Sequence, residues 1–223
     1  MRIGIAALTV FILCLEKAAL AEDVTTDGIL SDRDFYRLIS CGASPGMPCQ
    51  KAHKRWDADT AKSLTVGLRQ VQAGYPPLLD ELVLIGLLEA IEEINRVTSN
   101  VQLSWVLDGS EPDIDIYLVI PQEGRTIRGT GTRMLDGAKI ANAIVVSNRR
   151  HGQITEAAIA FSHRLDVSDV NSIALEDLFQ ALGFIYDIDN PAYLTRSIVY
   201  EKDSFLERLG EQDIRALKTK YAY

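Results

Sequence analysis

The polar side chains that could do chemistry together lie on one predicted helix. Glu176 and Gln180 are four residues apart, so they share a face of that helix one turn from each other, and Asp177 stands beside the first. A carboxylate in the middle of a helix that packs on a sheet must be solvated, hydrogen-bonded or protonated, because burying it unpaired is costly. Two interpretations stay open. In the first, Glu176 has a structural role: it lines a water-filled groove or pairs with Arg133 or Arg164. In the second, it is an acid of raised pKa in a binding cleft.

The elements that must position this helix follow from the spacing of apolar residues. Between residues 78 and 98 they recur every three or four positions, as in a helix with one buried face, and after Asn100 the period changes to that of strands. Strands are expected at 64–68, 101–105, 113–120, 143–147 and 154–161, and helices at 34–40, 78–98, 172–182 and from 210 onwards. Residues 22–33 are polar and acidic and are expected to fray. This order predicts a single domain of the α+β class.

Two cysteines, Cys41 and Cys49, are expected to form a disulfide. They enclose a stretch rich in Gly and Pro, which can turn the chain sharply enough to bring the two Cβ atoms together in an oxidising compartment. The alternative is a metal or redox pair, but seven intervening residues do not match the two-residue spacing of zinc ribbons or thioredoxin-like sites. So small a loop gains at most about 2–3 kcal/mol on the chain-entropy model, so we expect the bridge to pin a loop.

Metal ligands of the usual types are sparse. The chain has three histidines, His53, His151 and His163. They lie on different predicted elements, and no two are spaced as a helical pair, so they predict no metal site. Asp187, Asp189 and Asn190 could offer oxygen ligands to calcium, but no twelve-residue calcium-loop pattern is present. We therefore expect an ordinary turn at these residues and neither a metal nor another cofactor.

The first 21 residues have the pattern of a secretory signal peptide. Met1 and Arg2 give a basic start, Ile3–Leu15 is apolar, and Ala19–Ala21 has the small-x-small pattern before a cleavage site. A buried N-terminal helix is the alternative. We expect cleavage after Ala21 and a periplasmic or secreted mature protein.

Composition and charge exclude two classes of partner. The chain has 223 residues, of which 23 are Lys or Arg and 31 are Asp or Glu, for a net charge of −8. Duplex binding requires clustered basic side chains, so nucleic acid is not an expected partner. After the signal peptide, the longest apolar run, Leu82–Leu88, is far shorter than the roughly 20 residues that cross a bilayer, so we expect no membrane span in the mature chain.

The order of these elements and the spacing from Glu176 to Tyr186 resemble the metzincin-type zinc metallopeptidases, the matrixin-like ones above all. In that family an active-site helix reads His-Glu-x-x-His-x-x-Gly-x-x-His. Aligned on Gly183, the same positions here read Glu176-Asp-Leu-Phe-Gln180-Ala-Leu-Gly183-Phe-Ile-Tyr186. The resemblance implies a mixed, twisted sheet backed by the long helix and by the former active-site helix.

The resemblance extends over residues 64–223. Residues 197–200 are similar to the family's later turn with its methionine replaced, and residues 209–221 are similar to its closing helix. It therefore implies three parts: the signal peptide at 1–21, an N-terminal extension with the disulfide loop at 22–63, and a metzincin-like domain at 64–223.

The family's zinc ligands are missing. Glu176, Gln180 and Tyr186 stand where the three histidines would be, and Asp177 replaces the general-base glutamate. A zinc peptidase needs three good donors and an open position for water, and an amide and a phenol are poor substitutes for two imidazoles. Asp177 is also one methylene shorter, so its carboxylate would fall about 1.5 Å short of the water. The resemblance thus implies a binding cleft of Glu176, Gln180 and Tyr186 without metal, in which Glu176 and Asp177 are the candidate catalytic residues.

The same segment is similar to a family of exported proteobacterial proteins known as domain of unknown function 2927, as are Phe35–Gly46 and Arg55–Trp56. That resemblance implies a metzincin-like fold in the cell envelope and supplies no activity. We expect an exported, non-catalytic protein that binds a polypeptide or another envelope component in the former substrate groove. The alternative is a hydrolase that uses Glu176 or Asp177 as acid or base, without zinc or with atypical metal ligands.

Overall fold

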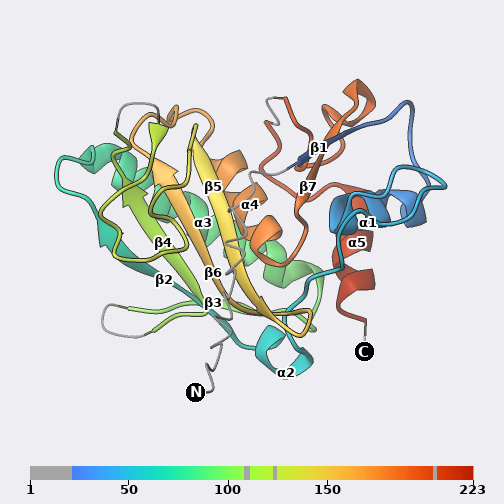
Figure 1. Ribbon diagram of the computed structural model, residues 1–223, viewed down its shortest axis with the longest axis horizontal. Coiled ribbons are helices and arrows are strands. Elements are labelled where there is room, and N and C mark those ends of the chain that lie inside the picture. The colour runs from blue at the N-terminus through green and yellow to red at the C-terminus, as the bar shows by residue number, and fades with distance from the viewer. Residues whose placement is uncertain (1–21, 108–110, 123–124, 203–204, 223) are drawn as a thin grey trace, which may run out of the picture.

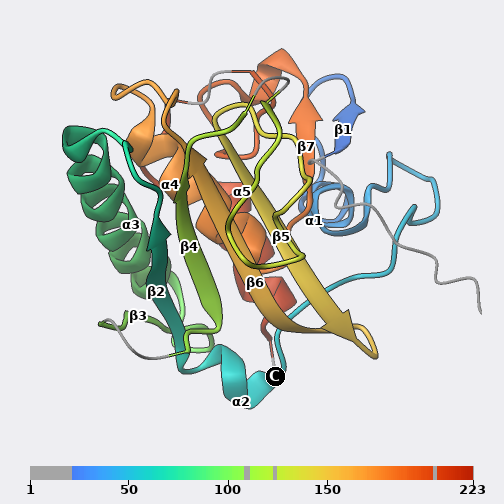
Figure 2. The same cartoon turned by 60° about the vertical axis from the view of Figure 1, so that its left-hand side comes forward.

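A five-stranded sheet with the order β3-β2-β4-β6-β5 runs through the larger part of this computed structural model (Figure 1). The structure describes residues 22–107, 111–122, 125–202 and 205–222, so the expected signal peptide lies outside the described residues. The strands are β2 (Leu64–Val71), β3 (Leu103–Trp105), β4 (Ile114–Val119), β5 (Ala143–Arg150) and β6 (Gln153–Ser162). All neighbours are parallel except β5, which runs antiparallel to β6 and forms an edge of the sheet (Figure 2).

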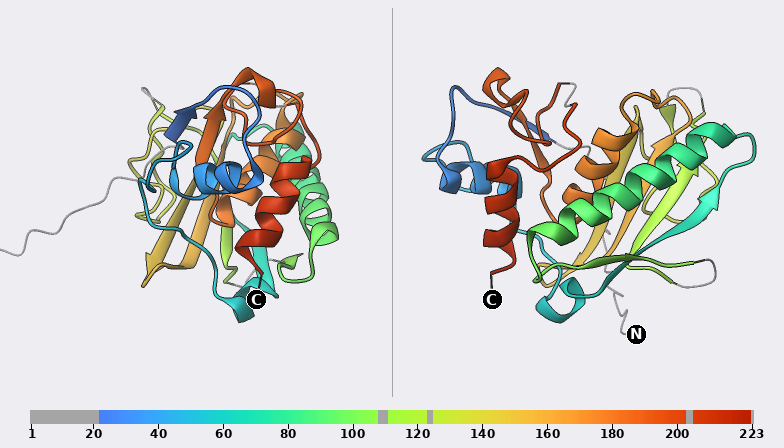
Figure 3. Two further views of the ribbon diagram at one scale, coloured as in Figure 1. Left: turned by 90° about the vertical axis from the view of Figure 1, so that its right-hand side faces the viewer. Right: turned by 180° about the vertical axis from the view of Figure 1, so that it is seen from behind.

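Two helices, α3 (Pro77–Val97) and α4 (Val170–Ala181), cover one face of this sheet (Figure 3). They pack closely because α3 has a glycine at the contact: a Cβ on Gly86 would lie only 3.3 Å from Val170 and 3.4 Å from Ala174 of α4. Residues 125–142 cover the opposite face with a small core of their own, which includes Ile127 and Leu135. The mixed sheet and its helices confirm the expected α+β class.

A second, two-stranded parallel sheet joins β1 (Glu22–Thr25) to β7 (Tyr186–Asp189) beside α1 (Asp32–Cys41) and α5 (Glu211–Lys220) (Figure 1). Two expectations were wrong here, because residues 22–25 form a strand and the segment with Asp187 and Asp189 is also a strand and not a turn. The backbone of each strand pairs with the other, with Val24 opposite Ile188, and neither local sequence indicates that partner. The short helices α2 (Ala58–Ala61) and η2 (Pro191–Tyr193) complete the fold.

The expected disulfide between Cys41 and Cys49 is confirmed, with the two Cα atoms 5.1 Å apart. Cys41 ends α1, and the next residue, Gly42, has a φ of 71°, which closes the helix in the left-handed conformation that glycine adopts without strain. The backbone N–H of Gln50 then donates to the carbonyl of Cys41 at 2.9 Å, so the loop is tied back to the helix end.

The start of α5 holds the preceding segment in place through a buried carboxylate, Asp213. It accepts hydrogen bonds from the Ser197 hydroxyl at 2.6 Å, from the N–H of Ile198 at 3.0 Å and from the N–H of Gly210 at 2.8 Å. Burial raises the pKa of Asp213 to about 6, and these hydrogen bonds oppose that rise. The anchored segment continues to Glu201, whose N–H donates to the carbonyl of Ile188 in β7 at 3.2 Å.

Across residues 22–107, 111–122, 125–202 and 205–222, no helix is both long enough and apolar enough to cross a bilayer.

Candidate functional site

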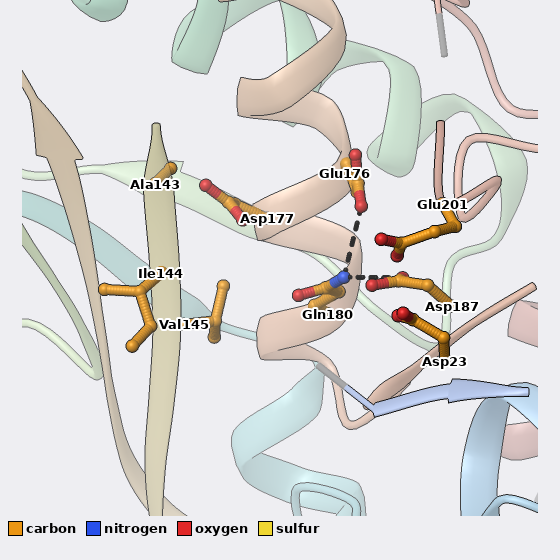
Figure 4. A pocket seen from close by; sticks show the side chains of 9 residues that line it. All are labelled: Asp23, Ala143, Ile144, Val145, Glu176, Asp177, Gln180, Asp187 and Glu201. Atoms are coloured by element: carbon orange, nitrogen blue, oxygen red, sulfur yellow. Dashed lines mark hydrogen bonds between the residues drawn. The ribbon is translucent and has the colours of Figure 1, made fainter. Parts of the chain in front are cut away.

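A cavity of about 340 Å³ lies between the edge strand β5, helix α4 and the small β1–β7 sheet (Figure 4). It is lined by Asp23, Ala143, Ile144, Val145, Glu176, Asp177, Gln180, Asp187 and Glu201. Five of the nine residues are acidic and none is basic, so the cavity gathers carboxyl groups at one place on the molecule.

Helix α4 supplies the polar side chains in the middle of the cavity. Glu176 and Gln180 lie one turn apart on the same face, as their spacing predicts, and the Gln180 Nε2 donates to Glu176 Oε1 at 3.3 Å. The same nitrogen donates to Asp187 Oδ1 at 3.0 Å (Figure 4). One amide thus bridges two carboxylates from two different elements.

The other end of the cavity holds three carboxylates from three segments. Asp23 in β1 lies directly opposite Asp187 in β7, and Glu201 follows β7 on the segment that Asp213 anchors. Carboxylate oxygens of Asp23, Asp187 and Glu201 all lie within 4.8 Å of one another. Asp187 is only 6% exposed, whereas Asp23 and Glu201 are open to solvent.

Crowding and burial raise the pKa of four carboxyl groups in the cavity, those of Glu176, Asp177, Asp187 and Glu201. Burial, and after it the charges of Asp187 and Asp177, raise the pKa of Glu176 well above its usual range. The pKa of Asp177 is raised in the same way by burial and by Asp187. Burial and the charge of Asp23 raise the pKa of Asp187 to about 7, against the hydrogen bond from Gln180. For Glu201, partial burial of the carboxyl group and its hydrogen bond with Asp23 raise the pKa to about 8.

We expect the free energy of unfolding of the protein to fall as the pH rises from about 4 to about 7. Asp187 has a pKa of about 7 in the folded chain, against its usual 3.8, so over this interval the folded state binds more protons than the unfolded state. Stability is therefore lost as the pH rises through the folded pKa. Urea unfolding at pH 5 and pH 8 measures the difference.

The variant Asp187→Asn should reduce this pH dependence, because an amide cannot ionise and its oxygen can still accept from Gln180. Asp189→Asn is the matched control, since Asp189 lies on the same strand but its carboxylate pairs with Lys202 at 3.1 Å. An unchanged slope in Asp187→Asn would contradict the assignment of Asp187 as the group that titrates.

Tyr186 does not reach the cavity, although the alignment with the metzincin motif placed it there. Successive side chains of a strand point to opposite faces, so Tyr186 faces away from the side on which Asp187 lies. Its ring is buried against Gly42, where a Cβ would lie 2.5 Å from the Tyr186 Cζ, and the Lys51 Nζ lies 5.4 Å from the centre of the ring. The residue that converges with Glu176 and Gln180 is Asp187, one position further along.

The residues present do not fit the zinc ion that a metzincin-like fold implies. The Gln180 amide nitrogen already donates to two carboxylates, Tyr186 lies elsewhere, and no histidine lines the cavity. Neither Arg133 nor Arg164 is among the lining residues, so an arginine does not neutralise Glu176 there. Hydrolysis by zinc-activated water is therefore not a step that these residues support.

Three lining residues were missed or misplaced by reasoning from the sequence. Asp23 lies in a segment expected to fray, and its partner strand is far away in the chain, so no local pattern reveals it. The alternation of Asp187 and Asp189 with apolar residues did signal a strand, and a strand would have put Asp187 on the opposite face from Tyr186. Glu201 shows no sequence signal.

Comparison of the chain with protein-family models finds no match, and comparison with curated proteins finds none either.

Proposed function

We propose that this chain is an exported, metzincin-like protein that binds an extended polypeptide along β5 without hydrolysing it. The observation that carries the proposal is the position of β5, which is an edge strand and also one wall of the cavity. An exposed sheet edge can add a peptide as a further strand through backbone hydrogen bonds, and neighbouring pockets then select its side chains.

The register of β5 shows which backbone groups are free to pair. The Ser162 N–H donates to the Asn142 carbonyl at 2.8 Å, so the hydrogen-bonded positions opposite β6 continue at every second residue, Ile144 and Val146. The N–H and C=O groups of the residues between them point away from β6. Among the described residues, no backbone partner pairs with this outer edge. Val145 lies at the centre of this outer edge, and its side chain lines the cavity.

Export is supported by the disulfide in the N-terminal extension, because such bonds persist mainly in oxidising compartments. The metzincin-like part of the proposal is supported by the long helix and α4 on one face of a mixed sheet with an antiparallel edge strand. Export and the metzincin-like fold are both what the sequence resemblance implies.

A second candidate function is acid–base hydrolysis without zinc, and one observation favours it. Asp187 has a pKa of about 7, which suits a group that both takes up and releases a proton near neutral pH. Binding without cleavage is the leading proposal, because the described residues that line the cavity include no histidine, cysteine or basic side chain that could activate a nucleophile or stabilise an oxyanion.

Selection of short peptides from a random display library, followed by titration in solution, tests the proposal. Val145→Pro should weaken binding of the selected peptide by at least about tenfold, because proline removes an outward N–H that the added strand would use. The N–H of Val145 does not pair with β6, so the ladder inside the sheet stays intact. Val145→Thr keeps the N–H and should bind as the wild type does. Equal peptide binding by the two variants would reject the β5 edge as the binding site. If the wild type cleaves the peptide and Asp187→Asn does not, the result would favour the hydrolase.

A further inference from the structure

We infer that the peptide added to β5 carries a lysine or arginine side chain, which enters the cavity and pairs with Asp177. This inference rests on the proposed function, because it names the class of peptide that the β5 edge selects. It concerns the end of the cavity between β5 and α4, where Asp177 extends from the helix toward Ala143 of the strand (Figure 4).

The carboxyl group of Asp177 has an oxygen that no donor satisfies. The residue is only 7% exposed, and its buried Oδ2 has no hydrogen-bond partner among the described residues. Its acidic neighbours differ, since one oxygen of Glu176 and one of Asp187 accept from the Gln180 amide. A buried polar atom without a partner is costly, so a ligand that donates to Asp177 removes a cost that the free protein bears.

The side chains of β5 alternate between the two faces of the main sheet. Ala143 and Val145 pack against the core on the α4 side. Ile144 and Val146 belong instead to the small core under residues 125–142. Ala143 and Val145 are also residues whose N–H and C=O groups point away from β6. A residue of the added strand directly opposite either of them turns its side chain to the same face, which is the face of α4 and the cavity.

A long basic side chain suits the walls of this cavity. The volume of about 340 Å³ lies within the range of about 300–1,000 Å³ that is usual for small-molecule pockets, so there is room for one such side chain. Ala143 and Val145 offer apolar contact to its methylene stem, and Asp177 offers an acceptor to its charged end. None of the lining residues is basic, so no cation on these walls competes for Asp177.

The charge of the incoming group matters as well as its hydrogens. Burial and the charge of Asp187 raise the pKa of Asp177, so its ionised form is disfavoured in the free protein. An ammonium or guanidinium group within hydrogen-bond reach favours that ionised form. Hydrogen bonds between charged groups are roughly twice as strong as those between neutral groups. We therefore expect selection of basic side chains over uncharged hydrogen-bond donors.

Sequencing the peptides that are selected from a random display library tests the inference. On the wild type we expect lysine or arginine at one fixed position of the binding sequence. Asp177→Asn should lose this preference, because the amide keeps the size of the side chain and cannot carry the charge. Asp189→Asn is the matched control, since the Asp189 carboxylate pairs with Lys202 and does not line the cavity. It should select the same basic position as the wild type.

Titration of one selected peptide gives the size of the effect. Replacement of its basic residue by norleucine should weaken binding to the wild type by at least about tenfold. The same replacement should change binding to Asp177→Asn by no more than about twofold, because the partner of the charge is already gone. The comparison of the two peptides on the wild type needs no variant protein, so it does not depend on the folding of Asp177→Asn.

The outcomes separate this inference from the proposed function. Peptides that lose affinity for Val145→Pro but show no basic preference would overturn the inference and leave β5 as the binding edge. An equal loss on norleucine replacement in the wild type and in Asp177→Asn would also overturn it, because another group would then hold the charge. If no peptide is selected, or if Val145→Pro binds as the wild type does, the proposed function fails and the inference fails with it.

Discussion

The triple variant Glu176→His, Gln180→His, Asp187→His should bind one zinc ion per chain, at least about a thousandfold more tightly than the wild type. The polar ends of these three side chains already converge, since the Gln180 Nε2 lies 3.3 Å from Glu176 Oε1 and 3.0 Å from Asp187 Oδ1. Two nitrogens that bind one tetrahedral zinc at about 2.0–2.1 Å lie about 3.3–3.4 Å apart. The side-chain ends at these positions are therefore already close to the separation that zinc ligands need.

The matched control is Glu176→His, Gln180→His, Tyr186→His, which follows the alignment of the metzincin motif. It should not form the site, because the side chain at position 186 faces Gly42 and not the cavity. Zinc calorimetry on both variants, after circular dichroism has shown that each is folded, gives the comparison. Tight binding by the Tyr186→His variant and none by the Asp187→His variant would mean that β7 turns residue 186, and not residue 187, toward α4.

Gly183→Ala should destabilise the protein by about 3 kcal/mol or more. Gly183 has a φ of 95°, which is strained for alanine, and a Cβ there would lie 2.4 Å from the backbone oxygen of Lys54. Its carbonyl also accepts a hydrogen bond from the buried Lys220 Nζ at 2.7 Å. This residue turns the chain from α4 into β7, so a shift here would separate Gln180 from Asp187.

The control separates backbone strain from the steric clash. Gly152 also has a positive φ, 81°, but a Cβ there would meet nothing within 4 Å. Gly152→Ala should therefore cost only about 1 kcal/mol. Urea unfolding of both variants measures the two costs, and equal losses of stability would mean that the contact with Lys54 does not constrain the turn.

The hydrophobic pattern predicted most of the fold correctly. The long helix expected at 78–98 is α3, and the five expected strands are those of the main sheet, because a buried face leaves a periodic signal in the sequence. The β1–β7 sheet was not predicted. Its strands are four residues long and half acidic, and each is stable only because the other supplies its hydrogen bonds.

The site was predicted in part for the same physical reason. Glu176 and Gln180 were found because their spacing on one helix is fixed by local geometry. Asp23 and Glu201 come from segments that meet α4 only in the folded chain, so no local spacing relates them to it. Tyr186 was placed in the cleft by its alignment with the last histidine of the metzincin motif. After Gly183 the chain enters β7, in which Asp187 and not Tyr186 faces the cavity.

The structure of the protein with a selected peptide bound is the most direct test of the proposed function. We expect an intact peptide whose backbone pairs with the outer edge of β5, at Ala143, Val145 and Ser147, with one side chain entering the cavity beside Asp177. A peptide bound to another face of the molecule, or density for cleaved products at α4, would contradict the proposal.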